Sequence, residues 1–372
     1  MRADGMVRHW GIDEVLPRYS VKAEGFAMSG TNSIKRFTIA IVVAVVAGVA
    51  ASSAASAADR VIVDTAFVEA AIGRGALIWD VRDQSAYLRG HLPGAVNVGN
   101  VTSVLRDDRS EDYIAIEDIE RILGGAGIDG SREIVLYAGK ARPGPYFGYI
   151  TLRYLGVDNV SVYHGGIDDW KAAGKPVDND HVQLPPVTFK AALDANQLVT
   201  TEEVISKLGD GSVQIVDART DKEFSGEDIR ALRGGHIPGA VNFPYQSNWV
   251  DPDTPAKLAR RKVKNKDGMN LKPRDELEAM YAGLDKNKET IVYCQSGSRA
   301  SEAAVVLRDL GFRNVRVYDS SWLGYGNTFE APAENVSYFN VSRVDKRIRS
   351  LQMQIDSLQG EIDALKAAQK NQ

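Results

Sequence analysis

The sequence reads Ile291-Val292-Tyr293-Cys294-Gln295-Ser296-Gly297-Ser298-Arg299-Ala300-Ser301 around its single cysteine. The β-branched run predicts a strand that ends at Cys294, and the apolar residues that follow at helical spacing, as far as Gly311, predict a helix. Gly297 lets the loop between them curl, so that several N–H groups point inward toward the positive end of the helix. A lone cysteine is most often a small buried hydrophobe. The polar loop, the helix start and Arg299 instead favour a stabilised thiolate.

The pattern Cys-x-x-Gly-x-Arg after a strand resembles the active-site loop of the rhodaneses. These are sulfurtransferases that carry a persulfide on this cysteine. Four residues separate Cys294 from Arg299. Related cysteine phosphatases and arsenate reductases enclose five, to hold a larger tetrahedral oxyanion, and one position later this chain has Ala300. The loop length therefore favours the rhodanese interpretation over these two enzyme classes.

The chain contains two copies of one unit. Segments of the first copy recur in the second: Leu152–Gly156 as Leu307–Gly311, Asn159–Tyr163 as Asn314–Tyr318, Asp80–Arg82 as Asp217–Arg219, and Gly90–Asn97 as Gly235–Asn242. Strand-like runs alternate with helical patterns in each copy, which predicts an α/β fold with parallel sheets. The recurring Asp-x-Arg and Gly-His-x-Pro-Gly-Ala motifs resemble the framework motifs of rhodanese domains. The resemblance implies two rhodanese-like domains, 60–176 and 199–330, each a parallel sheet flanked by helices and joined by a linker at 177–198.

The first copy has no cysteine in its corresponding loop. The constant offset of the repeats pairs Cys294 with Gly139, whereas alignment of the preceding strands pairs it with Ala138. This loop also contains Pro143 and Pro145, which lack N–H donors. The first domain therefore cannot form a persulfide. The arrangement resembles tandem rhodaneses, in which an inactive first domain supports a catalytic second one.

The resemblance implies a role for each residue of the second loop. Cys294 is the catalytic nucleophile, and Arg299 is a fixed cation at the far end of the loop. The substrate-binding residues are Gln295, Ser296, Gly297, Ser298, Arg299 and Ser321. The first four of these supply loop amides. Ser321 belongs to Tyr318-Asp319-Ser320-Ser321-Trp322, which resembles the family's Tyr-Asp-Gly-Ser-Trp segment and brings Asp319 and Ser321 near the persulfide; Ser320 replaces the glycine.

One segment departs from the family pattern. Tandem thiosulfate and mercaptopyruvate enzymes commonly carry a substrate-binding arginine shortly after Asp-x-Arg, where this chain has Lys222-Glu223-Phe224. We expect the substrate anion to find its cation elsewhere, at Arg299 or Lys222. Asp217 and Arg219 are expected to form a framework ion pair, and His236 to be a hydrogen-bonded turn residue.

The N-terminal region has the order of a secretory signal. Lys35-Arg36 precede the apolar run Phe37–Ala50, and Ala55-Ser56-Ala57 forms an Ala-x-Ala cleavage site. Initiation at Met28 would give a signal of ordinary length, 28–57, with 1–27 an upstream start or a disordered extension. We therefore expect a periplasmic or secreted protein. The alternative is an uncleaved anchor that holds it at the membrane, because Phe37 to Ala58 could span a bilayer.

Composition narrows the possible partners. The net charge of −4 argues against a dedicated nucleic-acid binder. The basic residues of 257–266 are expected to form a solvated face, with attraction of an anionic substrate as the alternative. The five histidines are scattered without ligand spacing, so we expect neither a metal nor another cofactor. A single cysteine excludes an internal disulfide and offers no second thiol for dithiol redox chemistry.

The C-terminal segment 341–368 has a strict three-four apolar repeat, which predicts a coiled coil. The a positions are Val341, Ile348, Ile355 and Ile362, and the d positions are Val344, Leu351, Leu358 and Leu365. β-Branched a residues with Leu at d favour a parallel two-stranded coil, so we expect a homodimer. Glu361 at g and Lys366 at the following e would attract each other across it. The alternative is a helix that folds back onto the domains.

The sequence thus predicts an exported thiosulfate sulfurtransferase. Its partners would be a small-molecule sulfur donor and acceptor, with sulfur passing from thiosulfate through a Cys294 persulfide to cyanide or a thiol. Two alternatives stay open. One is a 3-mercaptopyruvate sulfurtransferase, and the other is a non-catalytic sulfur carrier or scaffold.

Overall fold

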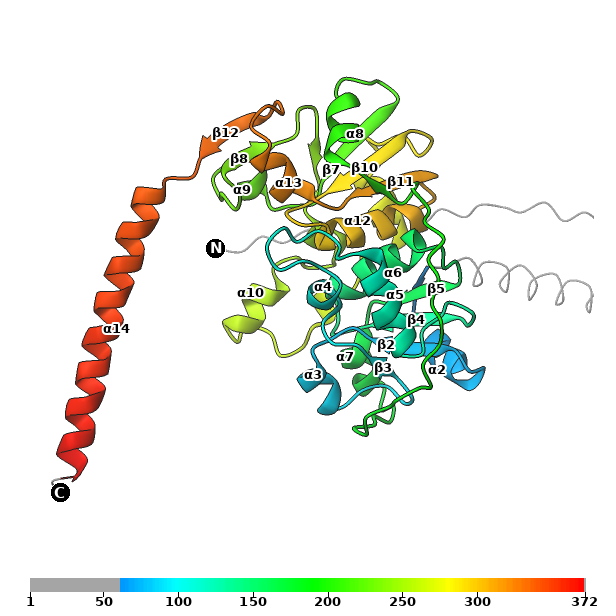
Figure 1. Ribbon diagram of the computed structural model, residues 1–372, viewed down its shortest axis with the longest axis horizontal. Coiled ribbons are helices and arrows are strands. Elements are labelled where there is room, and N and C mark those ends of the chain that lie inside the picture. Colours follow the sequence, from blue (N-terminus) through cyan, green and yellow to red (C-terminus); the bar gives the residue numbers. More distant parts are fainter. Residues whose placement is uncertain (1–60, 371–372) are drawn as a thin grey trace, which may run out of the picture. The chain divides into compact units, whose positions relative to one another are not determined.

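A computed structural model of the protein describes residues 61–370 (Figure 1). The predicted signal, 28–57, and the extension before it, 1–27, lie outside these described residues. None of the described helices is long and apolar enough to cross a membrane.

The first domain is a parallel five-stranded sheet flanked by helices (Figure 1). The strand order is β1 (Ile62–Val63), β5 (Val160–Tyr163), β4 (Ile134–Tyr137), β2 (Leu77–Asp80) and β3 (Val96–Asn97). Its helices are α2 (Thr65–Gly73), α3 (Gln84–Leu88), α4 (Val101–Val104), α5 (Ile116–Gly125), α6 (Gly144–Tyr154) and α7 (Gly166–Ala172). The central strands β2, β4 and β5 are buried along their whole length, as their apolar sequences require for a sheet covered on both faces.

The second domain repeats this topology. Its strand order is β6 (Leu198–Val199), β11 (Asn314–Tyr318), β10 (Glu289–Tyr293), β7 (Val213–Asp217) and β9 (Val241–Asn242), all parallel. Its helices are α8 (Thr201–Ser206), α9 (Asp221–Phe224), α10 (Thr254–Ala259), α11 (Arg274–Met280), α12 (Ser298–Asp309) and α13 (Ser321–Asn327), with 3-10 turns η1 (Tyr245–Asn248) and η2 (Asp267–Met269). The predicted α/β class with two parallel sheets is confirmed.

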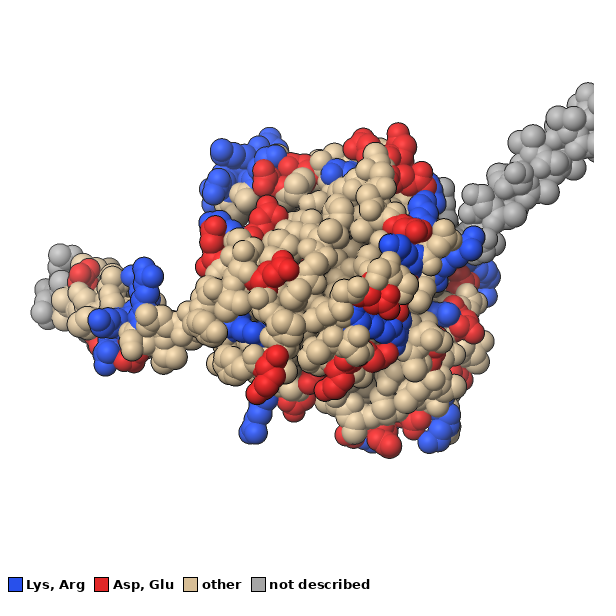
Figure 2. Space-filling view, turned by 90° about the horizontal axis from the view of Figure 1, so that it is seen from above, with Lys and Arg blue, Asp and Glu red and all other residues tan. Residues whose placement is uncertain are grey.

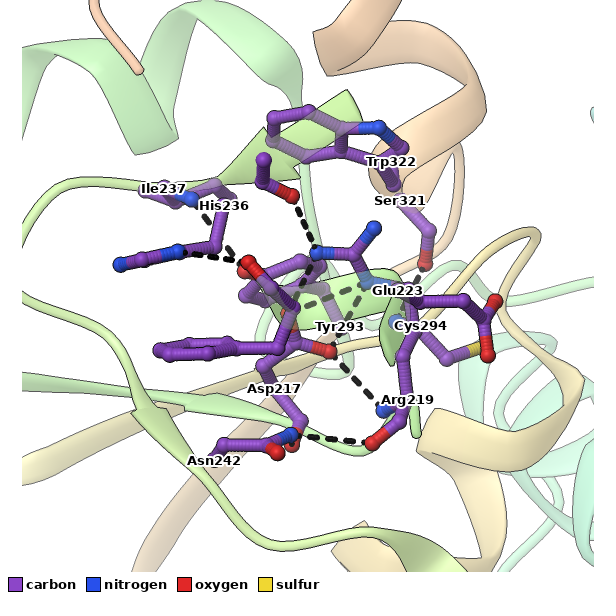
Figure 3. A network of polar contacts seen from close by, with 12 residues as sticks. Asp217, Arg219, Glu223, His236, Ile237, Asn242, Tyr293, Cys294, Ser321 and Trp322 are labelled. Atoms are coloured by element: carbon purple, nitrogen blue, oxygen red, sulfur yellow. Dashed lines mark hydrogen bonds and ion pairs between the residues drawn. The ribbon is translucent and has the colours of Figure 1, made fainter. Parts of the chain in front are cut away.

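The repeated Asp-x-Arg motif forms the same framework in both domains. In the second, Arg219 binds the buried Asp217 carboxylate through Nε and Nη2, and Nη2 also donates to the Gly235 carbonyl at 2.8 Å (Figure 3). The side-chain amide of Asn242 donates to the carbonyls of Asp217 and Arg219, each at 2.9 Å. These bonds tie the turn after β7 to the end of β9. Asp217 and Arg219 are therefore a buried framework pair.

The same contacts recur in the first domain, between Arg82, Asp80 and the Gly90 carbonyl. The histidine of each Gly-His-x-Pro-Gly-Ala motif is part of this framework. The His236 ring stacks on Phe224 at 3.6 Å between ring centroids, and its Nδ1 lies 2.9 Å from the Phe224 carbonyl oxygen. His236 is thus hydrogen-bonded as expected, but it is the last residue of strand β8 (Arg233–His236) and not a turn residue.

Helix α12 lies between the two domains and packs against α6 (Figure 1). The segment from Ala300 to Leu307 is buried throughout, and one continuous apolar core contains residues of both domains. A helix that is covered on all sides needs small or apolar residues around its whole circumference. This explains why the segment after the cysteine loop is rich in alanine and valine.

The C-terminal part begins with a two-stranded antiparallel sheet, in which β12 (Glu334–Tyr338) pairs with β8 (Arg233–His236). The helix α14 (Val341–Lys370) follows and covers the predicted coiled-coil segment. Seven of its eight a and d residues are exposed, with exposed fractions from 41% at Leu351 to 69% at Val341. Val344 is half-buried. The single chain therefore leaves this apolar seam uncovered.

Candidate active site

The single cysteine lies at the carboxyl end of the central strand of its sheet. Strand β10 ends at Tyr293, and α12 begins at Ser298. Gly297 between them has φ +80°. A Cβ at Gly297 would lie 2.5 Å from Asp319 Oδ1 and 2.7 Å from Arg106 Nη2, so both the conformation and the space require glycine. Cys294 itself is 1% exposed.

Ser321 binds the backbone of the cysteine loop through its hydroxyl group. Its hydroxyl oxygen accepts hydrogen bonds from the N–H groups of Cys294 (3.0 Å) and Gly297 (3.1 Å), and the hydroxyl donates to the Tyr318 carbonyl (2.6 Å). Figure 3 shows this side chain beside Cys294. Ser321 adopts φ +50°, a conformation that is costly for a residue with a Cβ. The second domain thus has a strained residue at this position, and the hydroxyl of that residue binds the cysteine loop.

The first domain identifies the counterparts of these residues. The Trp322 N–H donates to the Cys294 carbonyl at 3.0 Å, and Ile167 N–H donates to the Ala138 carbonyl at 2.9 Å. Of the two alignments that the sequence permits, the structure therefore selects Ala138 as the counterpart of Cys294. The counterpart of Ser321 is Gly166 at φ +55°. Where the thiol is missing, the supporting hydroxyl is missing too.

The predicted loop amides divide into two groups. The Gly297 N–H is bound by Ser321, and the Ser298 N–H donates to the Ser296 carbonyl at 3.0 Å. Among the described residues, the N–H groups of Gln295 and Ser296 donate no hydrogen bond. Of the four predicted loop amides, these two are therefore free to bind an anion.

Arg299 is paired with a carboxylate. Its Nη1 and Nη2 each donate to one oxygen of the buried Glu223 at 2.8 Å. Burial acts to raise the pKa of Glu223, but the bonds and charge of Arg299 outweigh it and lower the pKa to about 2. Burial likewise opposes the charge of Arg299, yet Glu223 and the nearby Cys294 raise its pKa above the ordinary value. The pair is ionised at neutral pH, and its two charges largely cancel.

Two residues of this region were not singled out in the sequence. Glu223 lies in the segment where related enzymes commonly have an arginine. An acidic residue there could have indicated that the cation of the loop, Arg299, forms an ion pair. Arg230 lies at the rim, with Nη1 3.8 Å from Glu223 Oε1 and its carbonyl bound by the Gln295 side chain at 2.8 Å. Lys222 is exposed and makes no ion pair in the described part of the chain.

A cavity of about 710 Å³ lies between the two domains, lined mostly by the first domain and its cysteine-free loop, and Ser298 is the residue of the cysteine loop that reaches it. Its lining includes Ser298 of the second domain and four basic side chains: Arg82, Lys140, Arg142 and Lys266. Lys140 is paired with Asp169 at 2.8 Å and Lys266 with Asp168 at 2.9 Å. Arg142 is exposed and has no charged partner among the described residues.

Elsewhere the charges are mixed. The face shown in Figure 2 has broad uncharged areas and one group of Lys and Arg at its upper left, and its other charges lie in small groups of both signs. Most basic side chains of 257–266 are exposed, and Lys257 is paired with Asp251 at 2.8 Å. No group of three or more metal-ligating acidic, His or Cys side chains occurs within the described residues.

Comparison with known proteins places the chain in a family. The rhodanese-like domain family matches residues 64–173 and 200–328. The thiosulfate sulfurtransferase of Corynebacterium glutamicum is 32% identical over 287 residues, which cover 73% of this chain and 90% of the relative. A Haloferax volcanii protein with the name "Putative thiosulfate sulfurtransferase" is 33% identical over 262 residues, which cover 68% of this chain and 86% of the length of that protein.

Among solved structures, the chain is similar to the anaerobic ergothioneine biosynthesis enzyme from Chlorobium limicola, in complex with its natural substrate trimethyl histidine. The TM-score is 0.62 at 25% sequence identity, with 74% of this chain and 70% of that chain covered.

Proposed function

The chain belongs to the rhodanese-like family as a two-domain sulfurtransferase, and on that premise we propose that it moves the outer sulfur of thiosulfate to cyanide or a thiol through a persulfide on Cys294. The observation that carries the proposal is the position of the single thiol. Cys294 directly follows the central strand β10, its N–H donates to the Ser321 hydroxyl, and it precedes the start of α12. Sites in open α/β sheets are found at this edge.

Sulfur transfer from thiosulfate to cyanide takes place in two steps. The Cys294 thiolate attacks the outer sulfur of thiosulfate, the S–S bond of thiosulfate breaks with its electron pair on the leaving group, and sulfite departs. The product is a Cys294 persulfide anion. Cyanide then attacks the terminal sulfur and leaves as thiocyanate, which returns the thiolate without a net proton or electron. No cofactor is needed for either step.

The loop supplies the stabilisation of the anion. The free N–H groups of Gln295 and Ser296 and the positive end of α12 are fixed dipoles beside the sulfur, which act without reorganisation. Arg299 contributes less than a free arginine would, because Glu223 neutralises it. The low exposure of Cys294 favours small donors and acceptors over a folded protein, and so supports an enzyme over a sulfur carrier.

Turnover on thiosulfate and cyanide tests this function. Wild-type protein should produce thiocyanate and sulfite, and its mass should rise by one sulfur after thiosulfate treatment and fall again with cyanide. The Cys294→Ser variant should do neither, since no other thiol is available. Substitution of thiosulfate by 3-mercaptopyruvate distinguishes the two donors. Persulfide formation without turnover would favour a carrier, and residual thiosulfate turnover by Cys294→Ser would refute the mechanism.

Arg142 of the first domain is our proposed contact for the anionic donor. It lines the cavity beside Ser298 without a charged partner. The Arg142→Ala variant should raise the KM for thiosulfate several-fold with little change in kcat, measured by initial rates. Arg260→Ala, in the exposed basic run, is the matched control, and equal effects of both variants would exclude a specific role.

Export remains part of the proposal. It is supported by the charged, apolar and small-residue order of residues 28–57. N-terminal sequencing of the protein from its native cells should find Ala58 as the first residue. An N-terminus that retains the apolar run would indicate a membrane anchor.

A further inference from the structure

We propose that Arg106, in the cysteine-free first domain, is a positioning residue for sulfur transfer: it fixes Asp319 and thereby holds Ser321 and the Cys294 loop in place. This inference rests on the proposed function. It also gives the first domain a defined task, since a domain that cannot form a persulfide can still determine the geometry of the domain that can.

The central contact is a buried ion pair between the two domains. Arg106 Nη2 donates to Asp319 Oδ1 at 2.5 Å, and the two side chains are 3% and 11% exposed. The pair lies directly against the cysteine loop, because a Cβ at Gly297 would meet both Asp319 Oδ1 and Arg106 Nη2 within 2.7 Å. A shift of this pair would therefore be transmitted to the loop at Gly297.

A second contact joins the same two segments. Arg106 and Tyr113 face each other in a hairpin of the first domain, 105–114. Within that hairpin Asp112 accepts a hydrogen bond from the Ser320 hydroxyl at 2.6 Å. Asp319 and Ser320, the two residues before Ser321, are thus both bound by the first domain. Ser321 needs such support, because a non-glycine residue at φ +50° persists only where its surroundings enforce it.

Ser321 connects these contacts to the reacting sulfur. Its hydroxyl oxygen accepts hydrogen bonds from the N–H groups of Cys294 and Gly297. A displacement of this oxygen would therefore move the backbone of the cysteine loop. Displacement of a reacting group by about 1 Å can reduce a rate about a hundredfold. Loss of the Arg106 contact should accordingly slow the reaction without loss of the cysteine.

The surroundings of Arg106 are not those of a residue selected for stability alone. Its guanidinium lies over the Phe147 ring, 4.3 Å from the centroid, while its Nε and Nη1 have no hydrogen-bond partner among the described residues. Buried N–H groups without partners cost free energy, and buried ion pairs are often no more stabilising than apolar residues of similar size. Burial raises the pKa of Asp319 to about 6, against the opposing charge of Arg106. The hairpin thus carries a buried arginine, Arg106, with an unfavourable burial free energy at its contact with the catalytic domain.

The test compares Arg106→Met and Arg106→Lys with wild type and with Arg74→Met, the matched control. Arg74 belongs to the first domain and is paired with Glu133 at 2.6 Å, away from the loop. We expect Arg106→Met to lower kcat for thiosulfate by about ten- to a hundredfold with KM changed less than about twofold. Arg106→Lys should recover much of this loss, and Arg74→Met should behave as wild type. The acidic limb of the pH profile should move upward in Arg106→Met, because loss of the cation raises the pKa of Asp319 further.

Two further measurements keep the proposal open to refutation. The rate of Cys294 alkylation by iodoacetamide reports loop geometry without turnover, and it should change in Arg106→Met but not in Arg74→Met. If Arg106→Met does not fold, Ser320→Ala removes the second contact without burying a lone charge, and it should lower kcat several-fold. Absence of thiosulfate turnover in wild type would refute the function and leave the alkylation result to judge the inference. A folded Arg106→Met variant with unchanged kcat, pH profile and alkylation rate would overturn the inference. If only Ser320→Ala folds, unchanged values in that variant would overturn it.

Discussion

At the scale of single residues, the site depends on how each charge near the thiol is paired. Arg299 occupies the position expected from the motif, but its two terminal guanidinium nitrogens, Nη1 and Nη2, both donate to the Glu223 carboxylate. It therefore fixes the end of the loop as much as it supplies charge. Among the described residues that line the cavity, Arg142 of the other domain is a cation without a charged partner.

Replacement of Arg299 should separate these two roles. Arg299→Ala leaves the buried Glu223 carboxylate without its partner, so we expect a loss of roughly 3–5 kcal/mol of unfolding free energy together with slower sulfur transfer. The double variant Arg299→Ala/Glu223→Gln removes the stranded charge and should regain most of the stability, as measured by urea unfolding. If the double variant also regains the full rate, Arg299 is purely structural. If it remains slow, the cation contributes to transfer.

At the scale of elements, α12 connects the catalytic loop to the domain interface. Its first turn carries Ser298 and Arg299, and the turn after it carries Glu302, which is fully buried. Glu302 Oε1 accepts from the Trp249 indole N–H at 2.8 Å, and Oε2 has no partner among the described residues. An ionised carboxylate is strongly disfavoured in such a place. The helix therefore carries a protonated acid at neutral pH.

This acid predicts a pH dependence of stability. Burial raises the pKa of Glu302 from 4.5 to about 8, more than the Trp249 bond lowers it. Between these two values the folded protein holds a proton that the unfolded chain has released, so stability should fall as pH rises, by up to about 1.4 kcal/mol per pH unit. Glu302→Gln should flatten this part of the curve in urea unfolding from pH 5 to pH 8. Equal slopes in both proteins would show that Glu302 titrates normally.

At the scale of the whole molecule, the exposed apolar seam of helix α14 has no partner within the described residues. Burial of a large aliphatic side chain stabilises by roughly 1.5–3 kcal/mol. Seven exposed seam residues on one helix therefore favour association strongly. A second copy of the chain fits best, because β-branched a residues with Leu at d suit a parallel pair and Glu361 would face Lys366 of the other helix. The homodimer remains a prediction.

Deletion of residues 340–372 should convert a dimer into a monomer with little change in thiosulfate turnover per site, because the described loop contacts involve none of these residues. Sedimentation and initial rates measure both. In the full chain, Leu358→Glu at a d position should have the same effect as deletion, and Met353→Glu on the outer face is the matched control. A monomeric full-length protein would refute the coiled coil, and a truncated monomer without activity would show that the helix contributes to the site.

The sequence by itself determined the parts of this protein that depend on neighbouring residues. Alternating strand and helix patterns, the duplicated framework motifs and the loop around Cys294 predict two parallel α/β domains and one thiol at the end of a central strand. These features could be predicted because hydrophobic period, turn chemistry and helix starts are local properties of the chain. The three-four repeat after Val341 predicts a long helix for the same reason.

Tertiary structure alone decided which distant side chains meet. Arg106 and Asp319 are 213 residues apart in sequence, and Glu223 and Arg299 are 76 apart. No local pattern pairs them, because such contacts are set by how strands order within a sheet and how two domains pack. The structure also chose Ala138 over Gly139 as the counterpart of Cys294, since hydrogen bonds from the following segment identify equivalent carbonyls where sequence spacing is ambiguous. The thiol is a local feature of the chain, whereas its charge environment is a property of the packed pair of domains.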